Sequence, residues 1–163
     1  MNLPSSSISP GRVASLHLHP IVSGAPLQAV GEIEVVAGKG ILGEPRYFGK
    51  VSRRTGKPRR RQVSLIAREE IAGHAAVLGL ESIPPGAVRA NIETEGIDLI
   101  QYLGREIQIG EAILLFYEGR TPCHQMDAIC QGLRQLMEND RQGVMAEVIR
   151  PGKIRSRDLI VPT

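Results

Sequence analysis

Short apolar runs with the length and pattern of β-strands dominate this sequence. Residues 13–18 alternate apolar and polar side chains, as expected for a half-buried strand. Residues 112–117 are continuously apolar, which predicts a buried strand. Similar patterns predict six further strands, at residues 32–37, 62–67, 88–93, 106–109, 145–149 and 158–161.

Two segments carry apolar residues at helical spacing instead. Residues 69–78 form the first and end at Gly79, a typical residue for stopping a helix. Residues 126–137 form the second, with an apolar stripe that begins at Met126. Eight short strands with only two helices predict a mainly β protein, built as a small β-barrel with helices packed against it.

Length and composition indicate a single domain. With 163 residues, of which 42% are hydrophobic, the domain is expected to span residues 12–163, after a disordered Ser- and Pro-rich tail at residues 1–11. No apolar run approaches the roughly 20 residues of a membrane helix, and the first ten residues lack the pattern of a secretory signal. Two cysteines are too few for a disulfide framework, so a cytoplasmic protein with reduced thiols is expected.

Positive charge is concentrated in one segment. The net charge is +3, but residues 46–61 hold 8 of the 20 Lys and Arg residues and no acid. The remainder has 12 basic against 17 acidic residues. Because this segment contains Gly49, Gly56 and Pro58 and shows no periodicity, it is predicted to be a long loop, and its charge implies a localised anionic partner.

Cys123 is the main candidate for chemistry. It lies between the strand predicted at 112–117 and the second predicted helix, and the preceding Pro122 suits a first helical turn. A thiol at a helix N-terminus faces unpaired N–H groups and the positive end of the helix dipole, which favour the thiolate that attacks and binds metal. The alternative is a cysteine that is simply packed in the core.

Several short motifs follow one another in a characteristic order. They are Gly-Ile-Leu-Gly-Glu at 40–44, Arg-Gln-Val-Ser at 61–64, Arg-Ala-Asn-Ile at 89–92, Gly-Ile-Asp-Leu at 96–99, Leu-Gly at 103–104 with Ile-Gly at 109–110, Pro-Cys at 122–123, and Gly-Lys-Ile-Arg at 152–155 followed by Asp158. No single motif is specific, but the ordered set, over about residues 12–161, resembles the MOSC domain. This domain forms the C-terminal part of molybdenum-cofactor sulfurases and also occurs as stand-alone bacterial proteins.

The resemblance implies a small barrel of the pyruvate-kinase type with a cofactor pocket and a functional cysteine at Cys123. That cysteine would ligate the molybdenum of the pterin cofactor or carry sulfur as a persulfide, and some family members reduce N-hydroxylated compounds. The residues expected to line the pocket and hold the anionic groups of this phosphorylated cofactor are Arg60, Arg61, Arg89, Asn91 and His124. Arginine offers a planar fork for phosphate, and asparagine offers a donor and an acceptor. The alternatives are ordinary surface arginines and a solvated histidine.

The partners follow from what the sequence lacks. The Gly-x-Gly-x-x-Gly string at residues 38–43 leads into the predicted basic loop and opens no predicted helix, so it is not a flavin or nicotinamide fingerprint, and the sequence has no cysteine cluster for iron–sulfur. A reductase would therefore need a separate electron-donor protein, and a sulfur carrier a separate sulfur donor. Pyridoxal phosphate, which sulfurases carry on another domain, is not expected, because all four lysines fall in predicted turns or loops.

The rival function is an anion- or nucleic-acid-binding module that uses the Arg-rich loop, residues 46–61. Nucleic acid is the less expected ligand, because only Tyr47 and Phe48 lie near the loop to stack on bases. On the first predicted strand, His17 and His19 share a face, where they could line a pocket but are expected to face water at a sheet edge.

Two positions depart from the family pattern. Glu44 stands where the family usually has Asp, and the longer side chain puts a tight turn or hydrogen bond there in question. Arg157 stands where a Gly usually precedes Asp158, which is expected to alter only the last turn.

Overall fold

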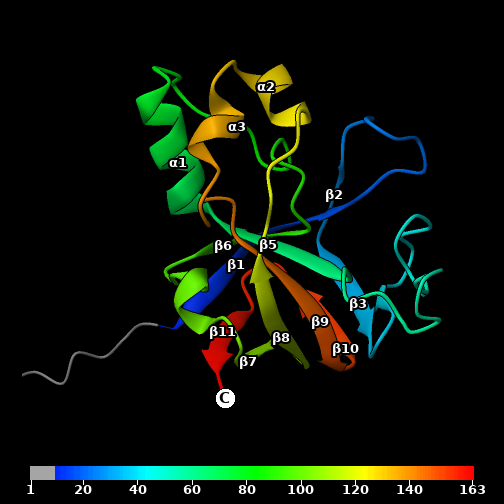
Figure 1. Cartoon of the computed structure of the whole chain (residues 1–163). Coiled ribbons are helices and arrows are strands. Elements are labelled where there is room, and N and C mark those ends of the chain that lie inside the picture. Colours follow the sequence, from blue (N-terminus) through cyan, green and yellow to red (C-terminus); the bar gives the residue numbers. More distant parts are fainter. Residues whose placement is uncertain (1–9) are drawn as a thin grey trace, which may run out of the picture.

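A closed barrel of seven strands forms the body of the protein. The structure is a computed structural model and describes residues 10–163. The barrel order is β11-β7-β8-β9-β5-β6-β1, and pairing between β1 and β11 closes it. Its strands are β1 (Gly11–Leu18), β5 (Val63–Ala67), β6 (Ile92–Glu95), β7 (Glu106–Ile109), β8 (Ala112–Gly119), β9 (Val144–Arg150) and β11 (Leu159–Pro162). The predicted fold, a small β-barrel with helices packed on it, is confirmed (Figure 1).

Four further strands and the helices complete the described architecture. β2 (Gln28–Val30) pairs with β1, and a second sheet has the order β10 (Gly152–Arg155), β3 (Glu32–Val36) and β4 (Gly40–Ile41). Within the barrel only β5 and β6 run parallel, and α1 (Arg68–Val77) makes the crossover between them. A 3₁₀ helix at Leu99–Tyr102 precedes β7. The α-helices gather at one end of the barrel, and the 3₁₀ helix lies apart from them (Figure 1).

Two apolar clusters stabilise this arrangement. Alternate residues of β8 point inward, so Leu114 and Phe116 are fully buried and fill the barrel with residues such as Leu16 and Ile107. A second cluster joins the helices to β5 and consists of side chains that include Ile66, Ile71, Met126, Leu133 and Met137. The end of the barrel that carries the helices is therefore a packed platform, which holds the loops around it in place.

The helix predicted at 126–137 is wrong in one respect, because the segment forms two short helices. They are α2 (Gln125–Ile129) and α3 (Leu133–Leu136). Between them Cys130 is extended, with φ −160°, and Gly132 has φ +96°. The Oδ1 of Asp127 accepts hydrogen bonds from the backbone N–H groups of Gly132 and Arg134, so a side chain takes the place of the helical ladder.

The strand predicted at 88–93 is also partly wrong, since β6 begins only at Ile92. Arg89 turns the chain with φ +64°, a conformation that no strand residue adopts. Val88 and Ala90 are buried, but in the cluster under the helices rather than in the barrel. Val88, Ala90 and Ile92 alternate with polar residues, which predicted a strand. Val88 and Ala90 pack under the helices, however, while Ile92 packs in the barrel.

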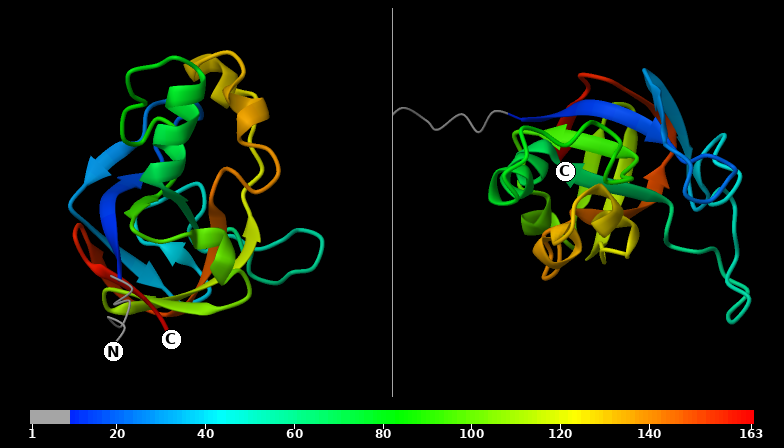
Figure 2. Two further views of the ribbon diagram at one scale, coloured as in Figure 1. Left: turned by 90° about the vertical axis from the view of Figure 1, so that its left-hand side faces the viewer. Right: turned by 90° about the horizontal axis from the view of Figure 1, so that it is seen from above.

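The basic segment at residues 46–61 is a loop, as predicted, and projects from the body (Figure 2). Its outer part folds back as a narrow arm, because Val51 pairs with Pro58 and the N–H of Ser52 donates to the carbonyl of Lys57. Of the predicted tail at 1–11, residues 1–9 lie outside the described residues, and Gly11 already belongs to β1. No helix within residues 10–163 has the length and apolar character needed to cross a bilayer.

Candidate functional site

A cavity of about 450 Å³ opens beside the predicted cysteine, at the barrel end that carries the helices. The loop after β1, the base of the basic loop, the end of β8 with the segment leading to α2, and the start of β9 all contribute to its wall. Four arginines line it, Arg46, Arg61, Arg89 and Arg120, against a single carboxylate, Glu118. This imbalance favours an anionic ligand.

Cys123 lies on the wall of this cavity with its side chain exposed. Its Sγ lies 3.9 Å from Oε1 of Gln125, within reach of a weak S–H···O hydrogen bond. The preceding Pro122 is buried, which fixes the chain at this point. The helix that follows has only five residues, so the dipole of a long helix, expected from the sequence, does not act on the thiol. The features of the structure that favour reactivity of Cys123 are therefore the exposure of its thiol and the arginines that line the same cavity.

Arg120 was not predicted and lies deepest among the cationic groups. It follows β8, is half-buried, and donates to the carbonyl oxygens of Gln142 (3.3 Å), Val88 (3.2 Å) and Arg89 (3.4 Å). Burial and, to a smaller extent, the neighbouring Arg61 lower the pKa of Arg120 to about 10, while Cys123 opposes that shift. Arg120 therefore stays cationic at neutral pH and ties its own segment to two others, at residues 88–89 and at Gln142.

The predicted arginines fall into different places. Arg89 lines the cavity, and its Nη1 donates 2.9 Å to the carbonyl of Ala25, which ties the loop after β1 to the site. Arg61 lines the cavity from the base of the basic loop, with its guanidinium 5.0 Å from the ring centre of Tyr47.

Arg60 does not line the cavity. Its guanidinium lies 4.2 Å from the ring centre of Tyr117 and forms a 3.0 Å ion pair with Glu147, which raises the pKa of Arg60. Tyr117 is itself part of the wall, and burial raises its pKa to about 12. Arg60 thus touches the site only through Tyr117.

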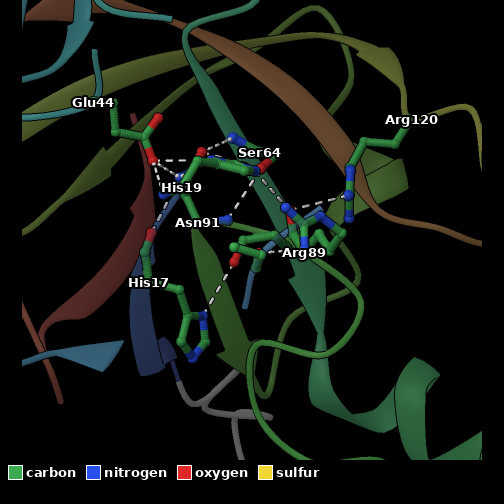
Figure 3. Close-up of polar contacts among 9 residues, drawn as sticks. His17, His19, Glu44, Ser64, Arg89, Asn91 and Arg120 are labelled. Carbon is green, nitrogen blue, oxygen red and sulfur yellow. Dashed lines mark hydrogen bonds and ion pairs between the residues drawn. The ribbon is translucent and has the colours of Figure 1, made fainter. Parts of the chain in front are cut away.

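Asn91 is the centre of a buried hydrogen-bond network (Figure 3). It is 2% exposed. Its Oδ1 accepts from the backbone N and Oγ of Ser64, at 3.0 and 3.1 Å, and its Nδ2 donates to the carbonyl of His17 and to Glu44. All of its amide groups are used within the protein, so these contacts give Asn91 a positioning role in place of the predicted contact with an anion.

Glu44 completes this network. Its side chain is longer than the Asp usual in the family, which put a hydrogen bond at this position in question, but the hydrogen bonds are formed. The buried Oε1 accepts from the backbone N of His19 (2.8 Å), from Nδ1 of the same residue (2.9 Å) and from Nδ2 of Asn91 (2.7 Å). The turn is formed as well, with the N–H groups of Tyr47 and Phe48 donating to the carbonyl of Glu44.

The expectation that His17 and His19 face water is wrong. They are 1% and 9% exposed, and His19 lines the cavity. Its Nε2 lies 3.2 Å from the carbonyl oxygen of Arg89, so the network reaches from Glu44 to the cavity wall. His124, by contrast, is exposed at the start of α2, lines the cavity and caps no backbone group.

The side chains of the described part of the chain do not by themselves provide a metal site. Within residues 10–163, no three His, Cys, Asp or Glu side chains come together as possible metal ligands. A metal in this cavity would need to arrive with most of its own ligands, and Cys123 could complete its coordination with a soft thiolate. The cavity therefore fits an anionic, metal-carrying small molecule better than a free ion.

Comparison with known proteins supports both the family and the fold. A family model described as the MOSC domain matches residues 34–161. The YuaD protein from Bacillus subtilis is similar in structure, with a TM-score of 0.76 and 22% identity over 92% of this chain and 93% of that chain.

Two YiiM structures are also similar. The protein from Escherichia coli has a TM-score of 0.65 and 20% identity, covering 94% of this chain and 68% of its own, and that from Geobacillus stearothermophilus has 0.70 and 16%, covering 94% and 75%. At these identities the likeness concerns the fold alone. No curated protein matches the chain.

Proposed function

The chain belongs to the MOSC domain family, and from this premise we propose that its cavity binds the phosphorylated pterin form of molybdenum cofactor, with Cys123 as a metal ligand. The observation that carries the proposal is the exposed thiol of Cys123 in a cavity with four arginines and one carboxylate. A negatively charged cofactor that brings its own metal matches both features.

The residues of this chain would hold the cofactor rather than react themselves. Arg61 and Arg89 present guanidinium groups to phosphate oxygens, while Arg120 adds positive charge beneath the thiol. His19, fixed by Glu44, supports the wall next to Arg89. The bound molybdenum would supply two-electron redox chemistry.

The proposed reaction is reduction of an N-hydroxylated compound. The N–O bond breaks, nitrogen gains two electrons and one proton, and the hydroxyl takes a second proton and leaves as water. In this proposal the two electrons come from a separate reduced electron-transfer protein.

Elemental analysis for molybdenum tests the proposal directly. Wild-type protein, Cys123→Ser and Cys130→Ser would be purified from a host that makes the cofactor. We expect stoichiometric molybdenum in the wild type and in Cys130→Ser, because Cys130 does not line the cavity, and a loss in Cys123→Ser. No molybdenum in any of the three proteins would contradict the proposal.

Sulfur transfer is the second candidate, favoured by the exposure of the Cys123 thiol. A persulfide forms when the Cys123 thiolate attacks the outer sulfur of a persulfide on the donor protein, whose S–S bond breaks and whose thiolate leaves, and this attack requires access to the thiol. Intact-mass spectrometry after incubation with a cysteine desulfurase and cysteine would show the mass of one added sulfur atom, lost in Cys123→Ser. Absence of that mass in the wild type would exclude this candidate.

The basic arm is the feature that favours the rival, an anion- or nucleic-acid-binding module. Its side chains Arg53, Arg54 and Lys57 are exposed, and among residues 10–163 none of them forms an ion pair. If the rival holds, replacing all three by Gln would abolish salt-sensitive binding of a DNA or RNA oligonucleotide, and Cys123→Ser would leave it unchanged.

A further inference from the structure

The basic arm, residues 50–59, carries positive charge that the described part of the chain leaves unpaired. The two limbs of the arm are joined by the pairing of Val51 with Pro58 and by a 2.9 Å hydrogen bond from the N–H of Arg59 to the carbonyl of Lys50. All of its basic side chains are exposed, and within residues 10–163 none forms an ion pair. They are Lys50, Arg53, Arg54, Lys57 and Arg59. Because the arm projects from the body, this charge is accessible to a partner (Figure 2).

The shape of the arm is set by its own hydrogen bonds. The N–H of Ser52 donates to the carbonyl of Lys57, and the N–H of Gly56 donates to the carbonyl of Ser52, each at 2.8 Å. The Oγ of Ser52 also accepts from the N–H groups of Arg54 and Thr55, at 3.3 and 3.4 Å. A preformed arm loses little conformational entropy on binding, which favours its use as a docking element.

Both ends of the basic arm continue into the wall of the cavity that holds Cys123. Arg46 and Tyr47 line that cavity before the arm, and Arg61 lines it after the arm. The guanidinium groups of Arg46 and Arg61 lie 5.5 and 5.0 Å from the ring centre of Tyr47, so this ring joins the two ends. A protein bound to the arm would therefore stand next to the candidate reaction centre.

The rest of the chain has the opposite charge, which restricts the kind of partner. Outside residues 46–61 there are 12 basic against 17 acidic residues. A compact acidic protein is attracted to the arm and repelled by the body, so it is steered to one place and one orientation. A nucleic acid would carry its phosphates past this short arm onto the acidic body. It would also find only Tyr47 and Phe48 near the arm for stacking on bases.

We propose that the basic arm is the docking surface for an acidic electron-transfer protein, which it holds beside the Cys123 cavity. The proposal rests on the function proposed above, whose reaction consumes two electrons, and adds the place where their donor binds. Complexes of electron-transfer proteins have small interfaces, below about 1,200 Å². A short charged arm is therefore large enough to direct one.

Charge reversal provides the test. One variant combines Arg53→Glu, Arg54→Glu and Lys57→Glu; only the backbone groups of these residues hold the arm together, so its fold is preserved. The matched control changes the net charge equally at three exposed arginines on the body, with Arg12→Glu, Arg105→Glu and Arg134→Glu. The probes are a flavodoxin and a [2Fe–2S] ferredoxin, two small acidic electron-transfer proteins. Their binding to the full chain is measured by calorimetry, with an RNA oligonucleotide for comparison.

We expect the wild type to bind both probe proteins, with an affinity that falls about tenfold between low ionic strength and ~0.15 M salt. The arm variant should bind them about tenfold more weakly than the wild type, and the body variant should stay within about threefold of it. Equal losses in the two variants would overturn the proposal, because net charge alone would then explain them. So would the absence of binding to both probe proteins at low ionic strength, or tighter arm-dependent binding of the RNA.

Molybdenum content separates this proposal from the function on which it rests. The arm variant should retain as much molybdenum as the wild type, because Arg53, Arg54 and Lys57 do not line the cavity. If the wild type contains molybdenum but the arm variant binds the probe proteins normally, the docking surface is wrong and the cofactor proposal stands. If the wild type contains none, the cofactor proposal fails, and arm-dependent binding of the probe proteins would still support the docking surface.

Discussion

The amide of Asn91 donates a 2.7 Å hydrogen bond to the carboxylate of Glu44, and both side chains are buried. They come from segments 47 residues apart, the turn after β4 and the approach to β6. The bond joins the second sheet to the barrel beside the cavity. The same oxygen of Glu44 also accepts two hydrogen bonds from His19, which offset part of the free-energy cost of burying this polar group.

Asn91→Ala should therefore destabilise the protein strongly. The change removes the acceptor of the Ser64 N–H and one donor to Glu44, and leaves both groups buried. We expect a loss of about 3 kcal/mol in the free energy of unfolding, measured by urea denaturation. Gln101→Ala, at an exposed position, should change it by less than about 0.5 kcal/mol. Similar stabilities of the two variants would show that the network contributes little.

Glu44→Asp tests whether the length of this side chain matters. The family more often has Asp here, but in this chain one oxygen of Glu44 reaches three donors. Shortening the side chain should break at least one of these bonds and cost about 2 kcal/mol, visible as a lower Tm. An unchanged Tm would mean that the turn shifts to follow the shorter carboxylate.

The sequence predicted the barrel well because its strands alternate between a packed interior and solvent. Strands β7 and β8 begin where expected, at Glu106 and Ala112. The strands it missed, β2, β4 and β10, have two to four residues each. Runs this short form strands only because a partner lies beside them, and a single sequence does not contain that information.

The site was predicted less completely, for the same physical reason. Cys123 could be located, because a local pattern of strand, proline and helix marks it. Arg120 was missed, since its three carbonyl partners come from segments up to 32 residues away and only folding brings them together. Its position directly after a buried strand, three residues before Cys123, is the one signal that could have indicated it. Asn91 was expected to line the pocket, but it is buried and does not belong to the cavity wall, because its amide turns inward to Glu44.

Arg157→Gly should stabilise the protein. Arg157 has φ +76° between β10 and β11, and its side chain is exposed. A left-handed residue other than glycine costs about 1–2 kcal/mol, while the greater freedom of glycine in the unfolded chain costs about 0.5–1 kcal/mol. The expected net gain is about 0.5–1 kcal/mol in urea denaturation. Arg157→Ala keeps the Cβ atom and should bring no gain; a gain of equal size would point to the lost charge instead.

The pH dependence of stability should report on Glu70 in α1. Burial raises the pKa of Glu70 to about 7, and Asp98 adds to the shift. In the unfolded chain the carboxyl titrates near its ordinary value of 4.5. Between these pH values the folded state holds a proton that the unfolded state has lost, so stability falls as pH rises from about 4.5 to 7.

Glu70→Gln should remove this loss and leave the variant more stable than the wild type at pH 8, by on the order of 1–2 kcal/mol after allowance for solvent screening. At pH 4, where both states of the wild type are protonated, the difference should vanish. Urea denaturation at pH 4, 6 and 8 would measure this. The exposed Glu81→Gln is the control, and the same pH profile in both variants would contradict the assignment.

Arg120 should contribute separately to stability and to anion binding. Arg120→Met leaves three carbonyls without their donor and removes a cation from the cavity. We expect a stability loss of about 2 kcal/mol and an affinity for pyrophosphate about tenfold lower, measured by calorimetry at low salt.

Arg120→Lys restores the charge but not the three-way donation, because an ammonium group lacks the planar fork of guanidinium. Its stability should stay low while its affinity recovers. Wild-type affinity in Arg120→Met would mean that the anion binds to the outer arginines alone.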